Sequence, residues 1–147
     1  SEISGTLMRV QLSKLEKILT GLRQRKAAMI SVLKEGGVDF VSSHDPEGDC
    51  GTSLHLRLND PMKASSLCRE LQESGLTVVP VSARPAYNFS QWIGILNVSE
   101  EERKSIAGDL SSSRILLAST LKVFIRPEWT LEEAKVKALE ISRKLQK

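Results

Sequence analysis

A run of apolar residues at helical spacing occupies the first third of the sequence. The steps along this run alternate between four and three, with Lys26 as the only intruder, and such a pattern is typical of a helix that packs along one side. The pattern predicts one helix from about Ser4 to Glu35, about 48 Å long at 1.5 Å per residue and ended by Gly36-Gly37. The remaining chain is too short to cover it, so we expect its N-terminal half to meet a second copy, a partner chain or another domain. The seam consists of Met8, Leu12, Leu15, Leu19, Leu22, Met29 and Leu33.

The pattern after Gly37 changes to short elements of mixed type. Leucines alternate with polar residues over 54–58, which predicts a half-buried strand, and residues 38–41, 76–81 and 121–125 predict three more. Asp60-Pro61 begins a helix, and the pairs Ser99/Glu102 and Thr130/Glu133 are capping boxes that begin two others. We therefore predict an α+β fold, with a small, mostly antiparallel sheet of three or four strands packed with helices and preceded by the long helix.

Length and charge limit the class of protein. The 147 residues are the size of one domain, so we expect residues 1–147 to form a single domain, with 1–35 as an interdomain-type helix and 36–147 as an α+β small domain. The net charge of +3 is interleaved with acidic residues and does not favour a nucleic-acid partner. Two cysteines and no apolar run near 18 residues favour a cytoplasmic protein without a membrane partner.

Few residues have the pattern of a metal or catalytic site. His44 and His55, with Cys50 between them, match no zinc spacing, and turn formation explains the segment 44–51. We expect no metal ligand and no catalytic residue in this chain. The basic residues of the first helix are predicted to form a solvated face; they are Arg9, Lys14, Lys17, Arg23, Arg25 and Lys26.

One loop has the composition of a binding surface. Residues 84–92 combine an arginine with aromatic side chains, a combination that is frequent where proteins contact ligands or partners. The alternative is a loop that its aromatic rings anchor to the protein's own core. The candidate binding residues are Arg84, Tyr87, Asn88 and Trp92.

Several segments, in order, resemble one family. They are 1–19, 23–25, 52–58, the helix through Leu71 with the turn 73–76, 85–96, and 115–133, the last with Pro127, Trp129 and Thr130. Together they resemble the C-terminal small domain of DegT-type aminotransferases, which are fold-type I enzymes that use pyridoxal phosphate and often act on nucleotide-linked keto-sugars.

The resemblance implies that the large and the small domain of the parent enzyme have different roles. In the family, an N-terminal large domain supplies the Schiff-base lysine and the phosphate-binding residues, so we expect no cofactor in this chain and no catalysis by it alone, although the parent would use pyridoxal phosphate. The resemblance implies that Arg84, Tyr87, Asn88 and Trp92 contact substrate or a dimer partner. It also implies that residues 7–33 contact a second copy or the large domain. Ser119 stands where the family often has an arginine for a substrate carboxylate, and a serine cannot replace a forked guanidinium.

A second hypothesis belongs to a different class. The chain could instead be a stand-alone, non-enzymatic interaction module that oligomerises through its heptad-like first helix. The length of the natural reading frame upstream of Ser1 distinguishes the two hypotheses.

Overall fold

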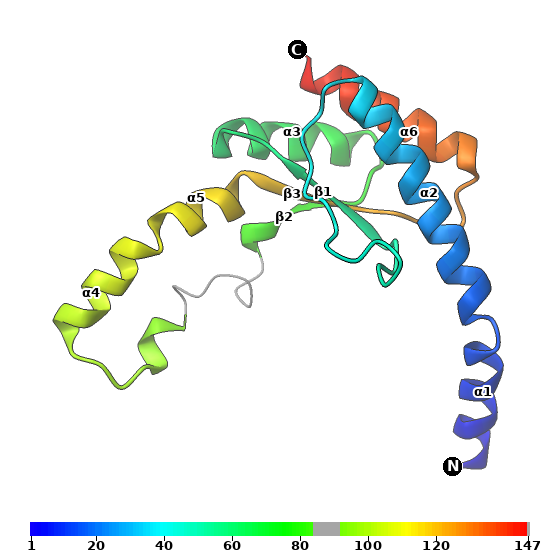
Figure 1. Ribbon diagram of the computed structural model, residues 1–147, viewed down its shortest axis with the longest axis horizontal. Coiled ribbons are helices and arrows are strands. Elements are labelled where there is room, and N and C mark those ends of the chain that lie inside the picture. The colour runs from blue at the N-terminus through cyan, green and yellow to red at the C-terminus, as the bar shows by residue number, and fades with distance from the viewer. Residues whose placement is uncertain (84–91, 147) are drawn as a thin grey trace. The chain divides into compact units, whose positions relative to one another are not determined.

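The computed structural model describes residues 1–83 and 92–146 (Figure 1). Their contacts group into two compact units. The first unit consists of Ser1–Val38, Ser42–Leu54 and Ile125–Lys147, and the second of Asp39–Val41 and His55–Phe124.

The first unit is built on two long helices that pack together. Helix α2 (Leu15–Glu35) lies along α6 (Leu131–Leu145). Helix α6 begins at the predicted capping box, where the Thr130 hydroxyl accepts from the Glu133 N–H and the Glu133 carboxylate accepts from the Thr130 N–H. The two helices bury Leu22, Met29 and Leu33 of α2 and Ala134, Ala138 and Ile141 of α6.

The predicted N-terminal helix is interrupted near its first third. Helix α1 (Glu2–Leu12) ends before α2 begins, and Ser13 and Lys14 lie between them. The Ser13 hydroxyl donates to the Val10 carbonyl at 2.8 Å, a local bond that competes with regular helix. No residue of α1 is buried, so the seam is covered only in its second half.

A three-stranded sheet is the centre of the second unit. The strand order is β1 (Ser53–Arg57), β3 (Thr120–Phe124), β2 (Val78–Pro80), and β2 is antiparallel to β3 with Val78 opposite Val123. Helix α3 (Pro61–Glu73) packs on β2 and β3 through its buried face, which includes Leu67 and Leu71. The predicted α+β class with a small antiparallel sheet is confirmed.

Two local predictions differ from the structure. The segment 38–41 is not a strand; it forms only an isolated bridge between Phe40 and Leu56, because its pairing with β1 does not extend further. Helix α4 (Glu100–Asp109) begins at the predicted Ser99/Glu102 capping box, but α5 (Ser111–Ala118) was not predicted. The described part of the unit also contains the short 3₁₀ turns η1 (Val81–Ala83) and η4 (Ile93–Ile95). Over residues 1–83 and 92–146, no helix is long and apolar enough to cross a membrane.

Candidate functional site

Most of the predicted binding loop cannot be placed. Arg84, Tyr87 and Asn88 lie outside the described residues. Trp92 precedes η4, its carbonyl accepts from the Ile95 N–H at 3.0 Å, and its side chain is 45% exposed. A role of these four residues in substrate or partner contacts therefore stays a prediction.

The described part of the chain contains no assembled metal-binding or reactive-thiol site. No group of three or more His, Cys, Asp or Glu residues there could hold a metal ion. Cys50 is exposed, whereas Cys68 is buried with its Sγ 3.7 Å from the Val78 carbonyl oxygen. Burial raises the pKa of the Cys68 thiol, which disfavours the reactive thiolate.

The best-defined polar cluster of the first unit joins α2 to the loop 42–54. Arg23 Nε donates to the Asp49 carbonyl at 2.6 Å, and Lys26 Nζ lies 2.5 Å from Asp49 Oδ2. Further along, Arg25 Nε donates to the Trp129 carbonyl. The prediction of a wholly solvated basic face is therefore wrong for Arg23, Arg25 and Lys26, which are partly buried because they satisfy acceptors on neighbouring segments.

Asp49 is held in its charged form by this cluster. Burial alone would raise the pKa of its carboxyl group, but hydrogen bonds from Lys26 and the Gly51 N–H, with the Lys26 charge, lower it overall. The Gly51 N–H lies 2.7 Å from Asp49 Oδ1. Gly51 has φ +70°, and a Cβ there would stand 2.6 Å from the backbone nitrogen of Arg23, so only glycine allows the loop this close to α2.

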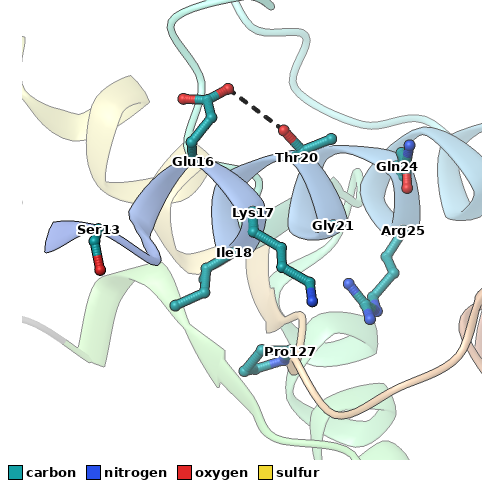
Figure 2. A pocket seen from close by; sticks show the side chains of 9 residues that line it. All are labelled: Ser13, Glu16, Lys17, Ile18, Thr20, Gly21, Gln24, Arg25 and Pro127. Atoms are coloured by element: carbon teal, nitrogen blue, oxygen red, sulfur yellow. Dashed lines mark hydrogen bonds between the residues drawn. The ribbon is translucent and has the colours of Figure 1, made fainter. Parts of the chain in front are cut away.

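A hollow of about 730 Å³ lies beside α2. Residues of α2 and its N-terminal flank, from Ser13 to Arg25, form most of its lining, and Pro127 lines it from the segment before α6. Figure 2 shows that the Lys17 and Arg25 side chains point toward one another on the side of Pro127. We call this feature the α2 hollow.

The acidic residue of the α2 hollow faces away from the two cations. Glu16 points in the opposite direction, toward Thr20, with its Oε1 3.5 Å from the threonine hydroxyl (Figure 2). Arg25 folds back over Gly21, and its Nη1 lies 2.7 Å from the position that a Cβ of residue 21 would take. Any larger residue at position 21 would therefore push the guanidinium away.

Sequence reasoning missed the α2 hollow because its two cations are eight residues apart on one helix. One signal was present. An interior helical glycine costs about 1 kcal/mol relative to alanine, so Gly21 in the middle of α2 needs a reason beyond helix formation. The space that the Arg25 guanidinium occupies supplies that reason.

Comparison with known proteins does not assign the chain to a family. No protein-family model matches the chain, and no curated protein matches it by sequence.

Proposed function

We propose that this chain is the C-terminal small domain of a DegT-like, pyridoxal-phosphate-dependent aminotransferase that acts in the cytoplasm on a keto-sugar or a related substrate. In this role the chain contributes substrate-side and dimer contacts, and the cofactor is bound by another part of the parent protein. The order of the family-like segments along the sequence is the basis of the proposal.

The exposure of α1 is the structural observation that supports it. Five of the eleven residues of α1 are large and apolar, and all five are between 45% and 74% exposed. They do not share one face, because neighbours such as Leu7 and Met8 point about 100° apart on a helix. A helix that is apolar on more than one side is typical of one buried among other elements. The five are Ile3, Leu7, Met8, Val10 and Leu12.

The same observation favours a second candidate function. A stand-alone interaction module would cover α1 with the α1 of another copy instead of with a large domain. The two candidates differ in what the natural gene encodes before Ser1 and in whether its product binds pyridoxal phosphate.

The deciding experiment uses the natural gene product. Its reading frame is sequenced upstream of Ser1, the whole product is purified, and pyridoxal phosphate is trapped with borohydride and located by peptide mass spectrometry. We expect about 200 or more preceding residues, in line with the usual size of a further domain, and one modified lysine outside residues 1–147. The isolated chain, treated identically, is expected to carry no stoichiometric adduct, because the family resemblance places the Schiff-base lysine in the large domain.

Two results would contradict the aminotransferase proposal. A start codon immediately before Ser1 would favour the interaction module. A stoichiometric adduct at one specific lysine of the isolated chain would show that the chain holds the cofactor itself.

A further inference from the structure

We propose that the α2 hollow binds a phosphate group, either free or carried by a small molecule. This inference is independent of the proposed function, because it uses neither the family resemblance nor the exposure of α1. Its starting point is the convergence of two positive charges, Lys17 and Arg25, on one hollow whose only acidic lining residue points away (Figure 2).

The convergence is unfavourable without an anion. Two like charges that approach each other repel, and a surface lysine has many rotamers that would point its ammonium elsewhere. An anion between them would turn the repulsion into two attractive interactions. No acceptor in the described part of the chain pairs with Lys17 Nζ or with the two terminal nitrogens of Arg25, so these donors are available to a ligand.

Arg25 is oriented before any ligand arrives. Its Nε is occupied by the Trp129 carbonyl, which fixes the plane of the guanidinium. Gly21 leaves the space that its Nη1 needs, 2.7 Å from where a Cβ would stand. A guanidinium held in this way loses little rotamer freedom on binding, so more of the interaction energy appears as affinity.

Phosphate fits these donors better than a carboxylate does. A phosphate monoester carries a charge of about −1.5 to −2 at neutral pH and offers three acceptor oxygens. The forked guanidinium can take two of them and the lysine ammonium the third. A hollow of about 730 Å³ leaves room for an attached organic group, and Ile18 and Pro127 supply apolar surface for it.

The test is an NMR titration of the chain at neutral pH and constant ionic strength. Inorganic phosphate, glycerol 3-phosphate, acetate and chloride are added separately, and the amide signals of Gly21 and its neighbours are followed. We expect saturable shifts with both phosphates and not with acetate or chloride. Tighter binding of glycerol 3-phosphate than of inorganic phosphate would identify a phosphorylated small molecule as the ligand, and the reverse order would identify free phosphate.

Charge variants separate a specific site from general attraction. Lys17→Gln changes an exposed side chain that makes no hydrogen bond or ion pair with the described residues, and it should weaken phosphate binding about tenfold, the effect of a lost charged hydrogen bond. The matched control is Lys14→Gln, which removes the same charge just before α2 but outside the hollow, and it should change binding by less than about twofold.

A third variant separates binding from stability. Gly21→Ala should displace the Arg25 guanidinium and weaken phosphate binding, while far-UV circular dichroism shows that α2 is retained, because alanine is the better helix former. The proposal is overturned if neither phosphate gives a saturable shift, or if acetate binds as tightly as phosphate. It is also overturned if Lys14→Gln weakens binding as much as Lys17→Gln, or if Gly21→Ala binds as well as the unmodified chain.

Discussion

Asp49 ties the loop 42–54 to α2 by hydrogen bonds. Its carboxylate accepts from Lys26 and from the Gly51 N–H, and its carbonyl accepts from Arg23. The Lys26 and Asp49 side chains are only 16% and 22% exposed, so water replaces a lost bond poorly. Removal of the carboxylate charge would leave a partly buried ammonium without its partner.

We predict that Asp49→Asn destabilises the first unit by about 1–3 kcal/mol at pH 7, the usual cost of an unsatisfied buried partner. The folded-state pKa of Asp49 is lowered from its ordinary value of 3.8, since the bonds from Lys26 and Gly51 outweigh the opposing effect of burial. A lowered carboxyl pKa adds stability above the unfolded value and loses it as the pH falls through the folded value. In urea unfolding, the free energy of unfolding should therefore differ between Asp49→Asn and the unmodified chain at pH 7. This difference should be lost as the pH falls below about 4.

The matched control for this prediction is Glu47→Gln, which changes an exposed carboxylate in the same loop. It should change stability by less than about 0.5 kcal/mol at every pH, as ordinary surface substitutions do. A difference between Asp49→Asn and the unmodified chain that stays constant from neutral to acidic pH would mean that the charge is not what stabilises the loop.

The composition of residues 45–51 was sufficient to predict a turn, but not its attachment to α2. Arg23 and Lys26 stand 26 and 23 residues before Asp49. A helical wheel shows where these charges lie relative to the apolar stripe: Lys26 interrupts the stripe and Arg23 lies at its flank. It cannot show a loop that arrives there from a distant part of the chain. Lys17 and Arg25 lie eight residues apart on α2, so the convergence of their side chains depends on side-chain conformation and was visible only in the structure.

Among the elements, the N-terminal seam was predicted correctly to be helical. Its sequence did not show which of its residues the rest of the chain covers. Periodicity identifies an apolar face but not what covers it: Leu22 and Leu33 are buried, whereas Met8 is 68% exposed. Helix α5 escaped prediction because it opens with three consecutive serines, which are weaker helix formers than alanine or leucine. The capping boxes of α4 and α6 were predicted correctly because each is a local pattern of four residues.

At the level of single helices and strands, we predict that the isolated chain self-associates through α1. The apolar residues of α1 are exposed in the single chain. Association would bury them, and the burial of apolar surface lowers the free energy. The double variant Leu7→Glu/Leu12→Glu places charges on two sides of α1 and should be monomeric by sedimentation at tens of micromolar. Far-UV circular dichroism should show that the variant keeps its helices, because neither residue is buried within the chain.

Met62→Glu is the matched control for the α1 prediction. Met62 is 78% exposed on α3, so this variant adds a charge at an equally exposed apolar position away from α1. It should leave the self-association unchanged. A monodisperse monomer of the unmodified chain would contradict the prediction, as would dissociation by Met62→Glu alone.

For the whole molecule, the α+β class could be predicted from sequence, whereas the division of contacts into two units could not. The chain passes between the units after Val38, Val41, Leu54 and Phe124. One of these points lies inside β1, so neither glycine and proline nor a change of composition marks it. Patterns along the sequence reveal boundaries where linkers are present. The expectation that residues 1–147 form one domain therefore stays a prediction, and it concerns whether the chain unfolds cooperatively.

We predict that the two units unfold in one transition, because the chain joins them at four points without a linker and neither can be separated by a single cut. Each unit carries one of the chain's two tryptophans, Trp129 in the first and Trp92 in the second. Trp92→Phe therefore leaves a fluorescence probe of the first unit, and Trp129→Phe leaves one of the second. In each variant, urea unfolding followed by fluorescence should coincide with unfolding followed by far-UV circular dichroism, which averages over all helices. A fluorescence midpoint that precedes the dichroism midpoint in one variant and follows it in the other would contradict the prediction, since each unit would then unfold with its own free energy.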